Sequence, residues 1–490
     1  MQRLFVLELA AVAAFGILAA WAVFSVPEPI RAISVEALAT GPAQESWSGI
    51  FIGDRHVGWS MSKESATAGG GRVSENRTSF ALGAQGATQQ ITMASTAVAD
   101  AAGQLQQFDF LLESVVSLRA HGVVVPGAVQ VEVEQGGSIQ TLEIPVPQPP
   151  VLSLTAGQLV RGRDLKPGDT FETPYFSLVT MSQSTMTMTV EAPELQPNGK
   201  IAHWLRMTAA GLTTRRLVDE NGDVLREEDT TLGLKQVRMT RAEALAVDEG
   251  DPPDLVALTR VPLTGFIDPA RPYGPLALRV TGASDQPLPS EGDIQRVSGD
   301  VVTLTTPDPA LWPVLPVRGS GDLEATLSLP VANEEIVARA SSVVGDAPDR
   351  ATAARRLNEF VFGYVTKAPT IGIPNGLEVL RSGQGDCNEH TALYVSLARA
   401  AGIPSRIAAG LVYNEAMGAA FYYHAWPEVR LGPGESWVAV DPTFGEFPAK
   451  ATHIKVVTGD LDKQVRILGL LGRLKISVEP SAAPDKAPPR

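Results

Sequence analysis

One part of the chain concentrates residue types that can do nucleophilic chemistry. Cys387, the single cysteine, lies in the segment GQGDCNEH, and His424 and Asp441 follow within 54 residues of it. In such a set the imidazole takes the thiol proton, the carboxylate fixes the imidazole tautomer, and the thiolate attacks an acyl carbon. The residue types therefore indicate covalent acyl chemistry, provided that folding brings the three side chains together.

Cys387 is expected at the first turn of a buried helix. Asp386 and Glu389 have the spacing of a capping box, which places the helix start at Cys387. The residues that follow are apolar nearly all round, and Gly402 ends the helix. Unpaired N–H groups and the positive dipole end favour a thiolate at this position, whereas the charge of Asp386 opposes it. A base is therefore needed.

His424 and Asp441 are expected on neighbouring strands. The segments FYYHAWPEVRL and SWVAVD flank the turn residues GPG, which predicts a hairpin. If Arg430 pairs with Glu435, His424 lies opposite Asp441 on one sheet face, with Cβ atoms about 5 Å apart. Pro427 leaves an alternative open, because a bulge there would change the register.

Other residues near these segments have competing interpretations. His390 shares a helix face with Cys387 and is a rival base, but no carboxylate is placed to orient it. The backbone N–H of Cys387 is a candidate oxyanion donor, and Gln384 is a second candidate. Structural packing or hydrogen bonding is the expected role of Arg406, Trp426, Trp437 and His453.

Four blocks of the sequence resemble the transglutaminase-like superfamily in its bacterial form. In chain order they read GQGDC (383–387), RAAGIPSR (399–406), HAWPEV (424–429) and WVAVDPT (437–443). The resemblance covers about residues 345–460 and implies a papain-like α+β core with a triad of Cys387, His424 and Asp441. We expect no cofactor and no metal, and the expected substrate is a protein or peptide.

The expected function is cysteine-dependent acyl transfer on a peptide or glutamine amide, through a thioester on Cys387. Water as the acceptor gives hydrolysis, as in a protease or amidase, whereas an amine gives transamidation. The sequence does not choose between these outcomes. A second hypothesis is a catalytically silent transglutaminase-like scaffold that acts as an envelope binding or assembly module.

Length and composition indicate several folded units. The chain has 490 residues, more than the ~250–300 at which one hydrophobic core stops growing. Its 40 basic and 54 acidic residues give a net charge of −14, which argues against a nucleic-acid partner. A single cysteine excludes an intramolecular disulfide and any zinc site built from several cysteines.

An apolar segment lies near the start of the sequence. Leu4–Phe24 contains 21 residues with Glu8 as the single charge, and as a helix it would span about 30 Å of hydrocarbon. We expect a retained membrane anchor over residues 1–26 rather than a signal peptide, although Ala20-Trp21-Ala22 offers a cleavage-like site. The flanking charges then predict a single-pass protein of the inner (cytoplasmic) membrane, with the membrane as a partner and the bulk of the chain periplasmic.

The expected fold class is multidomain: an N-terminal membrane helix, a large antiparallel β-rich region and a C-terminal α+β papain-like domain. Asn221-Gly222 predicts a hairpin within the β-rich region, and helical spacing begins at Glu334. The predicted divisions are a linker over 27–44, a β-rich domain over 45–245, a smaller β domain over 246–330, a transglutaminase-like domain over 331–475, and a disordered tail over 476–490.

Overall fold

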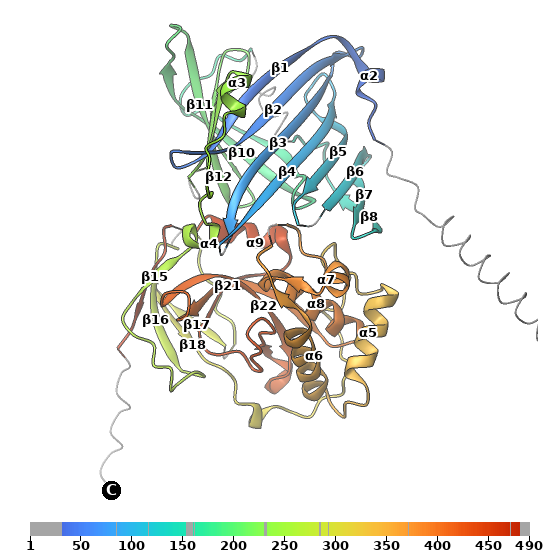
Figure 1. Ribbon diagram of the computed structural model, residues 1–490, viewed down its shortest axis with the longest axis vertical. Helices are drawn as coiled ribbons and strands as arrows, with labels where there is room; N and C mark the ends of the chain where they lie inside the picture. The colour runs from blue at the N-terminus through green and yellow to red at the C-terminus, as the bar shows by residue number, and fades with distance from the viewer. Residues whose placement is uncertain are drawn as a thin grey trace, which may run out of the picture.

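The computed structural model describes residues 32–480 apart from positions 85, 116, 153–159, 161, 230–232, 284–285, 293, 371 and 471. Two β-rich bodies follow one another along the chain. Figure 1 shows the first body above the second, with α4 (Leu255–Leu258) and α9 (Leu461–Leu468) between them.

The first body is one antiparallel sheet. Its strands pair in chain order from β1 to β8 and from β9 to β14, β14 lies beside β1, and β8 and β9 form the two edges. Its strands are β1 (Ala39–Ile52), β2 (Arg55–Thr67), β3 (Arg72–Ala84), β4 (Ala87–Ala99), β5 (Leu105–Glu113), β6 (Ser117–Val125), β7 (Ala128–Gln135), β8 (Ser138–Pro145), β9 (Thr170–Ser177), β10 (Ser182–Leu195), β11 (Ile201–Ala209), β12 (Leu212–Val218), β13 (Val224–Asp229) and β14 (Leu234–Met239).

Side-chain alternation along these strands builds the core of the first body. On β5, Leu105, Phe108, Phe110 and Leu112 are buried among residues that are more exposed. The predicted hairpin at Asn221-Gly222 is confirmed, since this turn joins β12 to β13. Two short helices, α2 (Val35–Leu38) and α3 (Arg241–Leu245), flank the sheet along the chain.

The second body is built on a sheet of nine strands with the order β17-β18-β16-β25-β15-β22-β21-β24, and β23 pairs with β22. Its strands are β15 (Val261–Thr264), β16 (Leu276–Thr281), β17 (Gln295–Ser298), β18 (Val301–Leu304), β21 (Ser405–Asn414), β22 (Ala420–Arg430), β23 (Trp437–Ala439), β24 (His453–Thr458) and β25 (Lys475–Val478).

The strands from residues 246–330, expected as a separate smaller β domain, do not form a sheet of their own. The late strand β25 pairs with both β15 and β16, and β15 pairs with β22. Strands from three distant parts of the chain therefore share one sheet. The domain boundaries themselves stay a prediction.

Helices pack together beside this sheet, around one helix that is buried over most of its length. They are α5 (Glu334–Val344), α6 (Arg350–Tyr364), α7 (Gly376–Ser382) and α8 (Cys387–Ala400). The side chains of Leu393, Tyr394 and Leu397 on α8 are fully buried in this core. The helix predicted from Glu334 is confirmed. A pair of two-residue strands, β19 (Thr366–Lys367) and β20 (Gln384–Gly385), precedes α8.

A loop of the second body reaches into the core of the first. Ile373 is 3% exposed and packs with the buried residues of the fourteen-stranded sheet. The Gln135 side chain on β7 donates to the Ile373 carbonyl at 2.6 Å, and that of Gln89 on β4 donates to the Pro369 carbonyl. The same loop carries Thr370, whose hydroxyl donates to Glu389 on α8 at 2.5 Å. The first body is thus linked to the start of α8.

The expected membrane helix requires a correction to the fold class. The segment Leu4–Phe24 lies outside the described residues, and no helix within the described ranges is long and apolar enough to cross a membrane. The longest, α6, has 15 residues, whereas a spanning helix needs about 20. The membrane helix is removed from the fold class, together with the single-pass inner-membrane localisation and the membrane as a partner.

Candidate functional site

The nucleophile candidate begins α8 as its sequence predicts. Asp386 accepts from the Asn388 backbone N–H at 2.8 Å, and Glu389 accepts from the Asp386 backbone N–H at 3.0 Å. These two bonds form the predicted capping box. Cys387 is partly exposed, whereas the helix behind it is buried from Glu389 to Ala398. Cys387 therefore lies at a fixed helix start, at the edge of the buried core.

The surroundings of Cys387 do not make a thiolate by themselves. Burial, followed by the neighbouring Asp386 carboxylate, raises the pKa of the thiol well above its ordinary value. A hydrogen bond from the Ala425 backbone N–H acts in the opposite direction. Since the net effect favours the protonated thiol, a nearby base must accept its proton before it can attack.

The edge of β22 lies against the start of α8. β23 pairs only with Glu428–Arg430 of β22, so the β22 edge at Ala425 is left to α8. Both backbone groups of Ala425 are used there: its N–H bonds to Cys387, and its carbonyl accepts from Thr391 at 3.0 Å. His424 precedes Ala425 in β22.

His424 and Asp441 are hydrogen-bonded, although not through the predicted register. His424 Nε2 lies 2.8 Å from Asp441 Oδ2, and the two residues are 3% and 0% exposed. Arg430 pairs with Trp437 rather than with Glu435, so the predicted register is wrong by two residues. The short helix η3 (Pro433–Glu435) lengthens the connection. Asp441 then follows β23 and forms a bridge with Glu446.

The Asp441 carboxylate is saturated with donors. Oδ1 accepts from the backbone N–H groups of Thr443 at 2.8 Å and Phe444 at 3.2 Å. Oδ2 lies 2.8 Å from His424 Nε2 and 3.0 Å from His453 Nε2. Burial would raise the pKa of Asp441, but the charges and hydrogen bonds of the two histidines outweigh it and hold the pKa well below its usual range. Asp441 is therefore ionised and fixed in orientation.

The cluster of His424, Asp441 and His453 also has the composition of a metal site. Zinc ligands at about 2.0–2.1 Å in tetrahedral geometry would lie roughly 3.3 Å or more from one another. The nitrogen–oxygen distances of 2.8 and 3.0 Å are those of direct hydrogen bonds. The arrangement therefore fits a hydrogen-bonded cluster and not a metal centre.

The remaining predicted site residues are less directly placed. Gln384 has an exposed side chain on β20, and its role as an oxyanion donor stays a prediction. His390 is buried, with Nδ1 2.6 Å from the Asp386 carbonyl. Its Nε2 has no partner among the described residues, so no carboxylate orients it. Burial lowers its pKa. His390 therefore lacks the orienting carboxylate that His424 has in Asp441.

Arg406 and Trp437 take part in a buried ionic cluster. The Arg406 guanidinium lies over the Trp437 ring at 4.0 Å and pairs with Glu428 at 2.6 Å. Glu428 also pairs with Lys455 at 2.7 Å, and Glu291 bonds both Arg406 and Lys455. This cluster connects the segment before β17 with the three strands β21, β22 and β24. These contacts support the structural role expected for Arg406 and Trp437.

Two aromatic residues near the triad were not singled out from the sequence. The Phe444 ring stacks on the His424 ring at 4.9 Å and 12°. The Tyr423 hydroxyl lies 2.8 Å from Oδ1 of Asn388, the residue that follows Cys387 in the chain. Burial, followed by the charge of Cys387, raises the pKa of Tyr423 well above its ordinary value. Tyr423 directly precedes His424 in the sequence, and Phe444 lies three residues after Asp441; this closeness along the chain was the available signal.

A large cleft continues outward from Phe444. It has a volume of about 1070 Å³ and is bordered by β15–β16, the end of β21 and the segment after Asp441. Phe266, which is 69% exposed, and Tyr413 add aromatic surface to its wall. Phe444 lines this cleft and stacks on His424, whereas Cys387, His424 and Asp441 are not among the residues that line it.

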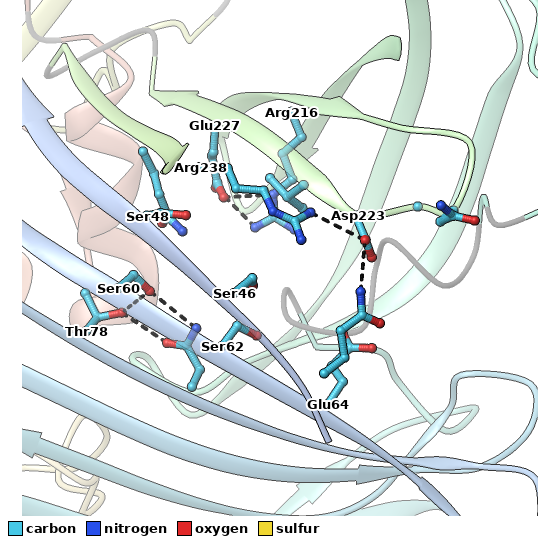
Figure 2. Close-up of a pocket in the computed structure, with 16 residues that line it drawn as sticks. Ser46, Ser48, Ser60, Ser62, Glu64, Thr78, Arg216, Asp223, Glu227 and Arg238 are labelled. Carbon is cyan, nitrogen blue, oxygen red and sulfur yellow. Dashed lines mark hydrogen bonds and ion pairs between the residues drawn. The ribbon is translucent and has the colours of Figure 1, made fainter. Parts of the chain in front are cut away.

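A second cavity, of about 220 Å³, lies in the first body and is lined by polar side chains (Figure 2). Ser60 and Thr78 are hydrogen-bonded at 2.9 Å. The charged groups pair with one another, Arg216 with Glu227 and Arg238 with Asp223 (Figure 2). No triad residue lines this cavity.

Comparisons with known proteins find similarity in one part of the chain. Residues 337–442 match the family model described as the transglutaminase-like superfamily. A protein-glutamine gamma-glutamyltransferase from Pseudomonas aeruginosa is 31% identical over 109 residues, which are 20% of this chain and 16% of that protein. The chain thus spans about a sixth of the length of this curated relative.

Solved structures show only distant similarity. A β-barrel-like protein of unknown function from Brucella abortus is 12% identical, with a TM-score of 0.34 over 41% of this chain and 97% of that one. A putative cysteine protease from Cytophaga hutchinsonii is 14% identical, with a TM-score of 0.28 over 41% of this chain and 72% of that one. The family match confirms the resemblance read from the sequence: residues 337–442 are similar to the transglutaminase-like superfamily.

Proposed function

We propose that the chain is a cysteine-dependent acyl-transfer enzyme that acts on a peptide or glutamine amide. The observation that carries this proposal is the 2.8 Å bond between His424 Nε2 and Asp441 Oδ2, beside a capped helix start that presents the single cysteine. With Nε2 engaged by Asp441, Nδ1 is the ring nitrogen left to accept the Cys387 proton.

The chemistry runs through a thioester. Nδ1 of His424 takes the thiol proton, and the Cys387 thiolate attacks the amide carbon to form a tetrahedral intermediate. As this intermediate collapses, the carbon–nitrogen bond breaks, and the protonated His424 gives the proton to the departing ammonia or amine. A water molecule or a second amine, deprotonated by His424, then attacks the thioester and releases Cys387.

The helix start offers a donor for the oxyanion. The Asp386 side chain caps the Asn388 N–H, so the Cys387 N–H is not used by this capping bond. A free backbone N–H at a helix start is well suited to stabilise the negative oxygen of the tetrahedral intermediate. Gln384 is the second proposed donor.

The cleft beside Phe444 supports a peptide substrate. Its volume of about 1070 Å³ and its aromatic wall fit an extended segment with apolar side chains next to the reacting amide. Asp268, Arg271 and Lys450 also line the cleft and supply polar contacts. Hydrolysis and transamidation both remain compatible with this arrangement, because the acceptor decides between them.

Trapping the acyl intermediate tests the proposal. The protein is incubated with a library of blocked glutaminyl peptides, with and without a primary amine, quenched in acid and examined by intact-mass spectrometry. A peptide-sized adduct that maps to Cys387 and is lost in Cys387→Ser and His424→Ala is expected. The partition of product between acid and amide shows which acceptor is used.

The trapping experiment also addresses the silent scaffold hypothesis. For this hypothesis no adduct forms with any peptide, and alkylation of Cys387 by iodoacetamide follows the pH dependence of an ordinary buried thiol. That combination of results would reject the proposed activity.

A further inference from the structure

A second histidine contacts the triad without being part of it. His453 begins β24, which pairs with β21 on the side opposite to β22. Its Nε2 lies 3.0 Å from Asp441 Oδ2, the same oxygen that bonds His424. The acyl-transfer chemistry proposed above assigns His453 no step.

The partners of His453 define its protonation. Nδ1 lies 3.0 Å from the backbone carbonyl oxygen of Lys450, and Nε2 faces the ionised Asp441 carboxylate. Carbonyl and carboxylate oxygens only accept hydrogen bonds, so both ring nitrogens must donate. A ring with two donating nitrogens is an imidazolium cation. Burial opposes this charge, but Asp441 outweighs burial, and the pKa of His453 is raised.

The surroundings of His453 hold the ring in place. It is 5% exposed, and the Trp426 ring packs against it edge-on at 5.0 Å. The other titratable groups that act on it are His424, with ring centroids 5.7 Å apart, and Glu446, which is itself paired with Lys450 at 2.7 Å.

We propose that His453 is a positioning residue of the acyl-transfer site, an imidazolium that fixes the Asp441 carboxylate against His424. The inference rests on the proposed function and deepens it. Four donors then immobilise Asp441: His453, His424 and the N–H groups of Thr443 and Phe444. The Asp441–His453 pair is neutral overall. It therefore orients His424 but attracts the protonated form of His424 less strongly than an unpaired carboxylate would. This arrangement eases the return of the proton to the leaving amine.

Loss of the His453 cation should shift the pH dependence of Cys387 alkylation in one direction. Removing a positive charge about 6 Å from His424 makes protonated groups in the site more stable, so the acidic limb of Cys387 alkylation moves to higher pH. A Coulomb interaction over this distance at an effective dielectric constant of about 20–40 corresponds to a shift of roughly one to two pH units.

Histidine ring NMR tests the charge state without any activity. The protein is labelled with ¹⁵N-histidine, and the ring nitrogens are observed at pH 8. The rings are observed in Cys387→Ser, where His424 receives no thiol proton; one of the six rings is expected to show two protonated nitrogens, and this signal disappears when His453→Gln is added. It persists in His121→Gln, a matched control in which the ring pairs with Asp109 at 2.7 Å in the first body. A Cys387→Ser spectrum with no doubly protonated ring at pH 8 overturns the inference.

The pH dependence of Cys387 alkylation tests the positioning role. In His453→Gln the acidic limb is expected to rise by about one unit or more, while His121→Gln keeps the wild-type curve. A folded His453→Gln protein with the wild-type curve overturns the role. If the wild-type thiol itself shows no activation, the proposed function fails, and the NMR result still decides the charge of His453. The NMR spectrum of Cys387→Ser also decides it if His453→Gln does not fold.

Discussion

Replacement of Asp441 by asparagine isolates the orienting carboxylate with almost no change in shape. The asparagine oxygen can still accept from the Thr443 and Phe444 N–H groups, but its NH₂ group then faces Nε2 of His424 and of His453. A donor facing Nε2 favours the tautomer of His424 with the proton on Nδ1. That nitrogen can then no longer accept the thiol proton.

The expected size of the effect follows from the environment of the thiol. The pKa of Cys387 is raised by burial and by Asp386 when no imidazolium is formed. A thiol with a pKa of at least about 8.5 is less than about 3% ionised at pH 7, so alkylation should fall by at least about 30-fold. For acyl transfer, a wrong tautomer in a triad of this kind costs about 10⁴-fold in kcat. The buried imidazolium left without its partner also lowers stability, by about 3–5 kcal/mol.

The assay is the rate of iodoacetamide alkylation at pH 7, read by intact mass, since the chain has one cysteine. Asp109→Asn is a matched control, because Asp109 also bonds a histidine, His121, but lies in the first body. It should alkylate at the wild-type rate. A folded Asp441→Asn protein that also alkylates at the wild-type rate would refute the reasoning, because Cys387 would then be activated without an oriented His424.

Two further predictions concern stability. Burial raises the pKa of Glu378 to about 7, above an unfolded value of about 4.3, so the native state loses stability as the pH rises from about 4 to 7. Glu378→Gln should remove this loss and raise the free energy of unfolding by about 1–2 kcal/mol at pH 8, allowing for partial exposure. Urea unfolding at pH 4 and pH 8 measures the change. Equal effects of the substitution at both pH values would contradict the prediction. Arg406→Ala removes one partner of the buried Glu428 and should lower the free energy of unfolding by about 3–5 kcal/mol. Arg430 is more exposed and pairs with Asp322, so Arg430→Ala should cost no more than about 1 kcal/mol. Equal losses in the two variants would contradict the role of the buried cluster.

Local signals in the sequence predicted the start of α8 correctly. The capping box of Asp386 and Glu389 involves residues three apart, so the start of α8 could be placed at Cys387 without knowledge of the rest of the fold. The hairpin turn at Asn221-Gly222 was equally local. Both features depend on backbone groups that neighbouring side chains satisfy.

The strand register near Asp441 could not be obtained in this way. The opposite charges of Arg430 and Glu435 favoured pairing them across the turn. In the fold, the Glu435 carboxylate bonds instead to the buried Arg350 at 3.1 Å, and Pro433–Glu435 form a short helix. A partner 85 residues away outweighed a favourable local pair, and His424 still reaches Asp441 because the chain bends after β23.

The sheet arrangement and the contact of His453 with Asp441 could not be predicted from the sequence for the same reason. The pairing of β25 with β15 and β16 joins segments about 200 residues apart, so residues 246–330 read as an independent unit. His453 reaches Asp441 only because β24 pairs with β21. Neither contact leaves a periodic or local signal, and an isolated histidine in the sequence is reasonably interpreted as structural.

The pH profile of Cys387 alkylation in the wild type and in His424→Ala tests the central claim most directly. If His424 accepts the thiol proton, the wild-type reaction should show an inflection well below about 8.5, the value of an ordinary thiol. The His424→Ala protein should inflect above that value, because burial and Asp386 then act on the thiol unopposed by an imidazolium. Identical profiles for the two proteins would contradict the account.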